Sequence, residues 1–145
     1  MTDIQTTAMD ARAEEIVQDF ALFDDWMGRY EYLIEMGKDL APLDDAYRTD
    51  AYKVRGCQSQ VWLVAERGAE DTIRFHADSD ALITKGLVAL LLKVLDGQPA
   101  GQIADSDLVF LDRIGMKEHL SPTRKNGLDA MVKRMKSFAE AFLAA

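Results

Sequence analysis

The spacing of apolar residues near the start of the chain predicts two consecutive helices. Apolar positions recur at alternating steps of four and three, which places them along one side of an α-helix: Ile16, Phe20, Phe23, Met27, Tyr30 and Ile34. Asp24 and Asp25 interrupt this stripe with side chains that favour helix N-caps, so we expect a break there. Gly37, followed by Lys38, is typical of a helix end, and residues 39–51 have no clean period and are predicted to form a loop.

The periodicity then changes to that of β-strands. At strand spacing, one face is formed by Val61, Leu63 and Ala65 and the other by Gln60, Trp62 and Val64. Over 72–77 the apolar residues Ile73, Phe75 and Ala77 again lie on one face, and "RGAED" at 67–71 predicts the turn between the two strands. The short segment "AYKV" at 51–54 is a candidate for a further strand. In that arrangement residues 55–59 form a loop that is held at both ends by strands.

The second half of the chain is predicted to be mainly helical. Residues 78–98 are apolar nearly all round, which predicts a central core helix with an N-cap at Ser79 and a stop at Gly97. Residues 97–115 predict short helical turns broken by glycine. A last helix begins with Ser121 as the cap and Pro122 at its first position. The order of helices, a few antiparallel strands and more helices predicts a single α+β domain over residues 1–145, in which a small sheet of about three strands packs against helices in two layers.

Length, composition and charge narrow the function classes. The chain has 145 residues, 48% hydrophobic and 29% charged, which suits one soluble domain. The net charge of −8 argues against nucleic acid as a partner, because phosphate binding needs a dense basic surface. No apolar run approaches the ~20 residues of a membrane span, and the first residues do not resemble a secretory signal, so we expect no membrane partner and a cytoplasmic location.

The charge is distributed unevenly along the chain. Residues 1–50 carry 13 acidic and 4 basic side chains, whereas seven basic residues between positions 113 and 136 are accompanied only by Glu118 and Asp129. An ordinary solvated helix face explains this pattern. The alternative is a docking surface for a protein partner, where charge steers the encounter.

The single cysteine, Cys57, is the main candidate for chemistry. One cysteine excludes an intrachain disulfide and any site that needs several thiolates, and we expect no metal and no cofactor on this chain. A lone cysteine is usually a small buried hydrophobe. Here it lies between Gly56 and Gln58, which favours a presented thiol, and the nearby Arg55 and Lys53 would lower the pKa of the thiol if they approached the sulfur. Burial in an apolar pocket would raise that pKa, so the two effects compete.

Four collinear segments resemble the SufE family. They are "WMGRYEYLIEMGKDL", "VRGCQSQVWL", "DSDALITKGLVALLL" and "HLSPTRKNGLDAM", and the similarity spans roughly residues 20 to 135. The resemblance implies a fold like that of the U-type iron–sulfur scaffolds without their metal-binding cysteines. It also implies that Cys57 accepts sulfur as a persulfide from a cysteine desulfurase, whose pyridoxal phosphate belongs to the partner. The expected donor is then a SufS-like desulfurase, which the protein would stimulate. The expected downstream partner is a SufBCD-like scaffold complex, and the protein itself is expected to be a monomer or a homodimer.

The resemblance also draws attention to residues around the cysteine. Arg55, Gly56 and Gln58 are expected to form the partner-binding loop. Arg124 matches an arginine of the family pattern and lies where the helix dipole disfavours a cation, so we expect it to contact the desulfurase; an ordinary surface ion pair is the alternative.

Three interpretations of the cysteine stay open at this stage. The first is a sulfur carrier, of either the SufE type or the CsdE type that serves a different desulfurase and acceptor. The second is a stand-alone thiol enzyme, such as a single-cysteine peroxidase or thiol hydrolase, and the third is an interaction module with a structural cysteine. His76 and His119 are not at a metal-ligand spacing, and could join Cys57 in a catalytic pair only through the fold.

Overall fold

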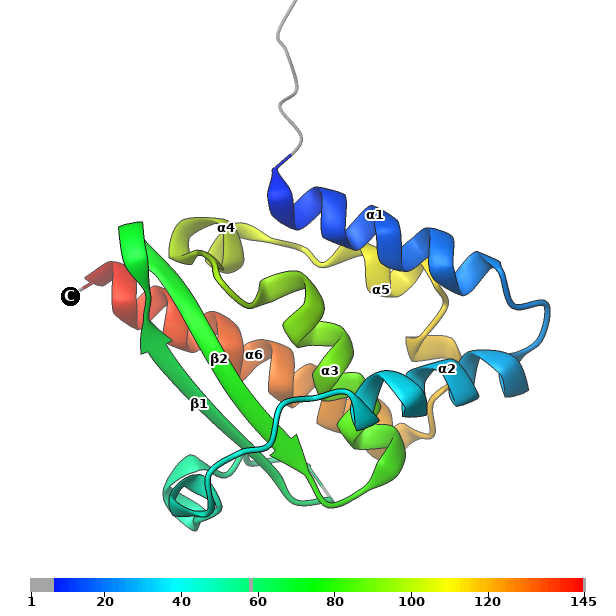
Figure 1. Ribbon diagram of the computed structural model, residues 1–145, viewed down its shortest axis with the longest axis horizontal. Helices are drawn as coiled ribbons and strands as arrows, with labels where there is room; N and C mark the ends of the chain where they lie inside the picture. The colour runs from blue at the N-terminus through cyan, green and yellow to red at the C-terminus, as the bar shows by residue number, and fades with distance from the viewer. Residues whose placement is uncertain (1–6, 58, 145) are drawn as a thin grey trace, which may run out of the picture.

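The computed structural model describes residues 7–57 and 59–144, and within them the chain forms an α+β fold as predicted (Figure 1). The described helices and strands follow one another as α1 (Ala8–Ala21), α2 (Trp26–Lys38), β1 (Val61–Arg67), β2 (Thr72–Ser79), α3 (Leu82–Leu95), β3 (Gln98–Pro99), α4 (Ala100–Asp105), α5 (Val109–Arg113) and α6 (Pro122–Ala144). Single 3-10 turns occupy Asp45–Tyr47 and Asp50–Tyr52 in the segment that precedes β1. The three strands form one antiparallel sheet in the order β1-β2-β3.

Side-chain caps separate the first two helices at the predicted place. Thr7 and Asp10 form a capping box at the start of α1. The Asp25 carboxylate accepts a hydrogen bond from the Gly28 N–H at 2.8 Å, which satisfies a free donor at the start of α2. The prediction of two helices with a break at Asp24 and Asp25 is therefore confirmed.

The predicted apolar stripe is right for α1 but wrong for α2. Ile16 and Phe20 are buried, whereas Met27 is 72% exposed and Leu33 is completely buried in its place. The break between the helices resets the helical phase, so α2 presents a different set of residues to the core. Gly37 is also not the end of the helix, which continues to Lys38.

The strand hairpin forms with the predicted alternation. Strands β1 and β2 pair from Val61 with Ser79 to Arg67 with Ile73, and the tight turn between them has positive φ at Glu70 and Asp71. Alternate residues face the helices and are buried: Val61, Leu63, Ile73, Phe75 and Ala77. The opposite face is covered locally, where Trp62 and Val64 pack with Leu43 of the preceding segment.

The third strand is not the one that the sequence suggested. Segment 51–54 contributes only an isolated bridge between Lys53 and Trp62 and a hydrogen bond from Val54 N to Val61 O. Strand β3 is instead Gln98–Pro99, which pairs with the start of β2. A two-residue strand contains no alternation, so no periodic signal marks it.

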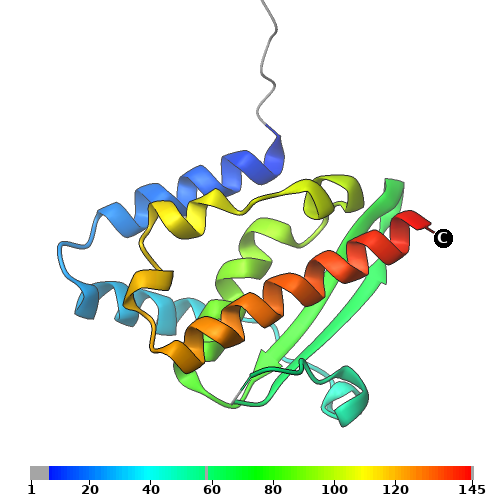
Figure 2. The same ribbon diagram turned by 180° about the vertical axis from the view of Figure 1, so that it is seen from behind.

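Helix α3 fills the centre of the molecule and α6 lies along the sheet (Figures 1 and 2). Nine of the α3 residues are buried, in agreement with the all-round apolar pattern. Its N-cap is Ala81 rather than Ser79, because β2 extends to Ser79. Gly97, two residues past the end of α3, has φ +75, which fits the predicted stop.

The last helix begins as the sequence predicts. The Ser121 hydroxyl accepts from the Arg124 N–H at 3.3 Å, and Pro122 is the first helical residue. Leu128, Met131 and Met135 are buried in the main core, while Phe138 and Phe142 pack partly against it. None of the described helices is both long enough and apolar enough to cross a membrane.

Candidate functional site

The loop that carries Cys57 leaves the 51–54 segment and returns at the start of β1. The hydrogen bond from Val54 N to Val61 O, 2.8 Å, closes the base of this loop. Gly56 has φ +93, a backbone conformation that residues with a Cβ rarely adopt. Cys57 therefore lies just beyond a glycine-dependent bend at the tip of a loop that is fixed to a rigid strand.

The Cys57 thiol is turned toward the start of α6. Its side chain is half-buried, and Sγ lies 3.5 Å from the carbonyl oxygen of Gly127, to which the thiol donates a weak hydrogen bond. Gly127 is buried, and a Cβ at this position would come 3.5 Å from the sulfur. The loop therefore lies in direct contact with the first turns of α6.

The sulfur borders a small polar cavity of about 250 Å³, here called the Cys57 cavity. It is lined by Cys57, Ser59, Thr84, Ser121, Thr123, Arg124, Gly127 and Met131. Four of these residues carry hydroxyl groups and one carries a guanidinium, so the wall can donate several hydrogen bonds to an anionic sulfur species. This donor set is suited to hold a charged terminal group, whereas an ordinary cysteine packing site would be apolar.

Burial, and not a nearby cation, determines the direction in which the pKa of the Cys57 thiol is shifted. Loss of solvent raises the pKa of Cys57 above the ordinary value for a thiol. Lys53 and Arg55, which would lower it only if they approached the sulfur, line a different hollow on the outer side of the loop. In this conformation Cys57 is therefore mostly a neutral thiol at neutral pH, and an exposed loop would make it more reactive.

This geometry predicts a strong pH dependence for alkylation of the free protein. Because the pKa of Cys57 is raised, the thiolate fraction is small near neutrality, and the iodoacetamide rate is expected to rise about tenfold per pH unit between about pH 6.5 and 8.5. The reaction is quenched at set times and the alkylated fraction is measured by mass spectrometry, with glutathione as the reference thiol. A rate that levels off below about pH 7.5 would show a lowered pKa and contradict this description of the cavity.

Polar contacts tie the second half of the loop to the junction of β2 and α3. The Gln60 N–H donates to Asp80 Oδ1 at 2.9 Å, and Asp80 N donates back to Gln60 O at 3.2 Å. The Thr84 hydroxyl lies 3.4 Å from that of Ser59. Asp80 and Thr84 thus position the loop, a role that nothing in the local sequence indicates.

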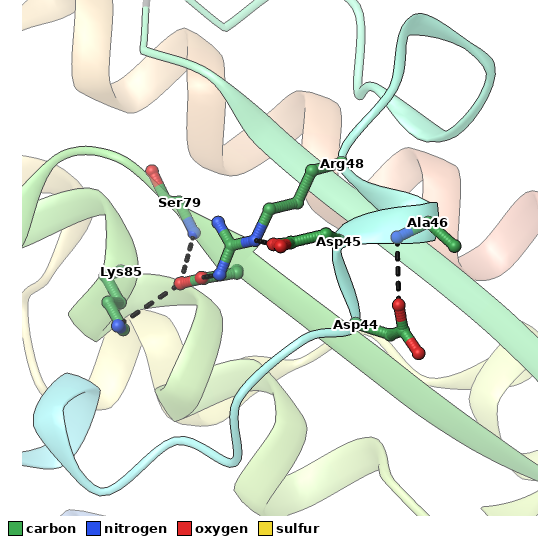
Figure 3. Close-up of polar contacts among 7 residues, drawn as sticks. Asp44, Asp45, Ala46, Arg48, Ser79 and Lys85 are labelled. Atoms are coloured by element: carbon green, nitrogen blue, oxygen red, sulfur yellow. Dashed lines mark hydrogen bonds and ion pairs between the residues drawn. The ribbon is translucent and has the colours of Figure 1, made fainter.

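A buried carboxylate supports the same junction from the other side. Asp78 is only 4% exposed, and its side chain binds Arg48 and Lys85 and accepts from the Ser79 N–H. Figure 3 shows Arg48, Ser79 and Lys85 converging from the loop before β1, the end of β2 and α3. Burial acts to raise the pKa of Asp78, but these hydrogen bonds together outweigh it and lower the pKa below its usual value.

Replacing Asp78 by asparagine is expected to lower the free energy of unfolding by about 2 kcal/mol at neutral pH, because two cations lose their common partner. The lowered pKa means that the stabilisation is present above the pKa of the unfolded state and is lost as the pH falls through the folded-state value. The difference in the free energy of unfolding between wild type and variant should therefore shrink in acid, as urea unfolding at several pH values would show.

Asp71→Asn, at a largely exposed pair with Arg67, is the control and should change the free energy of unfolding by less than about 0.5 kcal/mol. An equal effect at acid and neutral pH would contradict the assignment.

Neither histidine reaches the cysteine. His76 Nε2 lies 2.7 Å from Glu66 Oε1 on an exposed part of the hairpin, and the His119 ring stacks on Trp26 with centroids 3.8 Å apart. Neither lines the Cys57 cavity. Among residues 7–57 and 59–144, no group of His, Cys, Asp or Glu side chains is arranged to hold a metal ion.

The structure brings together part of the predicted site. Arg124 lines the Cys57 cavity and makes no ion pair with any described residue, which disfavours the alternative of an ordinary surface pair. Gly56 shapes the loop, whereas Arg55 lies on its outer side. Gln58 lies outside the described residues.

The site now has a single thiol at a loop tip, laid against a glycine of the last helix and beside Arg124, which pairs with no carboxylate of the described residues. The sequence model described as "SufE: Fe-S metabolism associated domain" matches residues 14–139 of this chain, which includes every element of the site. The chain belongs to the SufE family. The match to the family model confirms the resemblance of the four segments to the SufE family. The description of that model links the domain to iron–sulfur metabolism.

Individual relatives support the assignment to the SufE family. An uncharacterised SufE-like protein of Rhizobium meliloti is 46% identical over 136 residues, covering 91% of this chain and 97% of its own. A second, from Rhizobium etli, is 44% identical over 139 residues, covering 93% and 94%. A chloroplastic/mitochondrial SufE-like protein 1 of Arabidopsis thaliana is 41% identical over 128 residues, covering 88% of this chain and 34% of its own.

A solved structure shows the same fold. The solution structure of a hypothetical protein from Thermus thermophilus superposes with a TM-score of 0.75 at 19% identity, covering 92% of this chain and 97% of that one. Since the identity is low, this likeness concerns the architecture alone.

Proposed function

We propose that this protein accepts sulfane sulfur on Cys57 from a cysteine desulfurase, stimulates that enzyme, and passes the sulfur to the machinery that assembles iron–sulfur clusters. Membership of the SufE family supports the link to iron–sulfur metabolism. The observation that carries the proposal is the placement of Cys57, the sole thiol of the chain, at a loop tip beside a hydroxyl-rich cavity that is also lined by Arg124.

The proposed chemistry is a thiol–persulfide exchange. The Cys57 thiolate attacks the outer sulfur of a persulfide on the donor enzyme, a new S–S bond forms at Cys57, and the donor cysteine leaves as a thiolate. The reaction needs no external oxidant or reductant, because one S–S bond replaces another. A second exchange of the same kind moves the sulfur to a SufBCD-like acceptor and restores the Cys57 thiol. Pyridoxal phosphate acts only on the donor enzyme.

The loop is proposed to move during this cycle. A half-buried neutral thiol attacks poorly, so Cys57 would leave the cavity to meet the donor, where solvent allows the thiolate to form. After transfer the loop would return, and the hydroxyl groups and Arg124 would hold the anionic persulfide away from reductants. Arg124 could also contact the desulfurase while the loop is extended. We propose the cytoplasm as the location of this transfer.

The competing functions differ in what they require around the thiol. A stand-alone thiol enzyme needs an activated thiolate, usually with an adjacent base. The raised pKa of Cys57 and the distant placement of both histidines give no support to this class. A carrier of the CsdE type would use the same chemistry with a different donor, so the choice of desulfurase in the test separates the two carriers.

The test is to incubate the protein with a SufS-like or a CsdE-partner desulfurase and cysteine, and to measure its intact mass. The proposal predicts a gain of ~32 Da, the mass of one sulfur atom, that a thiol reductant reverses. The gain should require both cysteine and the desulfurase. Failure of every desulfurase to modify the wild-type protein, together with partner-free turnover of a peroxide or thioester, would overturn it in favour of a thiol enzyme.

A further inference from the structure

Four cationic side chains surround a shallow hollow on the outer side of the Cys57 loop. Lys53 and Arg55 come from the loop, and Lys133 and Arg134 come from α6, around a space of about 700 Å³. Asp50 is the single carboxylate among the lining residues. We call this surface, defined by the four cations, the basic hollow.

The four cations lack the partners that most other basic residues have. None of them makes an ion pair or donates a side-chain hydrogen bond to a residue within 7–57 or 59–144, although Arg134 lies over the Phe138 ring. By contrast, Arg48, Arg74 and Arg113 each bind a carboxylate. In a chain of net charge −8, convergence of four unpaired cations produces a local positive potential that is available to an outside anion.

The basic hollow directly adjoins the reactive loop. A Cβ on Gly56 would lie 3.3 Å from the Cβ of Ala130, which lines the hollow, while Cys57 contacts Gly127 one helical turn earlier. The loop thus crosses α6 with the Cys57 cavity on one side and the basic hollow on the other. A partner seated in the hollow is held beside the residue that must reach its active site.

We propose that the basic hollow binds an acidic surface segment of the protein that donates sulfur to Cys57. This inference rests on the proposed function, to which it adds the docking surface and the charge of the partner. The hollow is open and its cations lie on two separate chain segments, which suits an extended acidic protein surface. Nucleic acid is disfavoured, because four cations cannot offset the net charge of −8 over a longer phosphate chain.

The expected role is capture and orientation of the donor. Opposite charges at the edge of an interface mainly raise the association rate, and they act less on the steps that follow once the complex has formed. Weakening the basic hollow should therefore raise the concentration of carrier that half-saturates the donor, with little change in the rate at saturation.

The test compares two double charge reversals in the full chain. Lys133→Glu with Arg134→Glu alters the basic hollow, and Lys38→Glu with Lys93→Glu applies the same change of net charge at exposed positions on α2 and α3 that line neither the hollow nor the Cys57 cavity. We expect the half-saturating concentration for persulfide formation on Cys57 to rise about tenfold or more in the first variant and less than about twofold in the second. Added salt should weaken wild-type transfer strongly and the first variant little.

Several outcomes would overturn the docking proposal while leaving the proposed function intact. Wild-type sulfur uptake with equal half-saturating concentrations in both variants would do so, as would competition by a short single-stranded oligonucleotide at low concentration. Lys133→Glu alone controls for a folding effect, because Lys133 makes no ion pair or side-chain hydrogen bond within residues 7–57 and 59–144, and it should give a smaller shift in the same direction. By contrast, absence of sulfur uptake by the wild-type protein would count against the proposed function itself.

Discussion

Gly86→Ala is expected to lower the free energy of unfolding by about 3 kcal/mol, the largest loss of stability that a single added methyl group should cause in this chain. A Cβ at this position would lie 2.5 Å from the carbonyl oxygen of Leu33 and 2.8 Å from its side chain. The opposing surface is the backbone of α2, where a Cβ added to Gly37 would in turn lie 2.8 Å from the Gly86 nitrogen. Because Leu33 is fully buried, α2 can move away only by opening the core around it.

Urea unfolding followed by circular dichroism measures this effect, and Gly101 provides the matched control. Gly101 also lies within a helix, α4, but an added Cβ would meet no atom within 4 Å. Gly101→Ala should therefore be neutral or stabilising by up to about 1 kcal/mol, owing to the higher helix propensity of alanine. Equal midpoints for Gly86→Ala and wild type would show that α2 and α3 are not in close contact.

Cys57→Ala is expected to abolish sulfur uptake and the stimulation of the desulfurase, while the fold persists. No other thiol exists in the chain, so no second residue can complete the exchange. The side chain is only half-buried and its hydrogen bond to Gly127 is long, so the substitution should cost less than about 1 kcal/mol. The measurement is the rate of alanine release by the desulfurase as the concentration of the protein is increased.

Ser59→Ala is the control for the Cys57 substitution, because Ser59 lines the same cavity but cannot carry sulfur. It should retain uptake, with the persulfide lost more quickly to added reductant as one donor is missing. Stimulation of the desulfurase by Cys57→Ala to the wild-type level would separate activation from sulfur acceptance and contradict the present account of stimulation.

The sequence predicts those parts of the fold whose signal is local. The hairpin follows from the apolar run at 61–65, the alternation over 72–77 and the turn residues between them, and the start of α6 follows from the Ser-Pro pair at its N-terminus. The buried face of α2 was missed because the helical phase restarts at Asp25. Gly37 marks the end of α2 to within one residue, and its lack of a side chain also allows the close approach to Gly86, a contact between residues far apart in the chain that the local sequence does not predict.

The candidate site also combines residues that the local sequence identifies with contacts between distant residues that it does not. Cys57 and the bend at Gly56 can be recognised from a few adjacent residues, and Arg124 was found through the family pattern. The anchoring contacts to Asp80 and Thr84 join residues about twenty or more positions apart, so neither was expected. Whether Arg55 approaches the sulfur could not be predicted, because the direction of its side chain depends on how the loop lies on α6, where Arg55 lines the hollow on the opposite side.

The most direct test of the central claim is to locate the transferred sulfur within the chain. After a single turnover with desulfurase and cysteine, trypsin should release residues 56–67 as one peptide, since Arg55 precedes Gly56 and Arg67 ends the segment. This peptide is expected to gain ~32 Da on Cys57 and to lose it on reduction. Transfer of sulfur through the system at the wild-type rate with this peptide unmodified throughout would contradict the central claim.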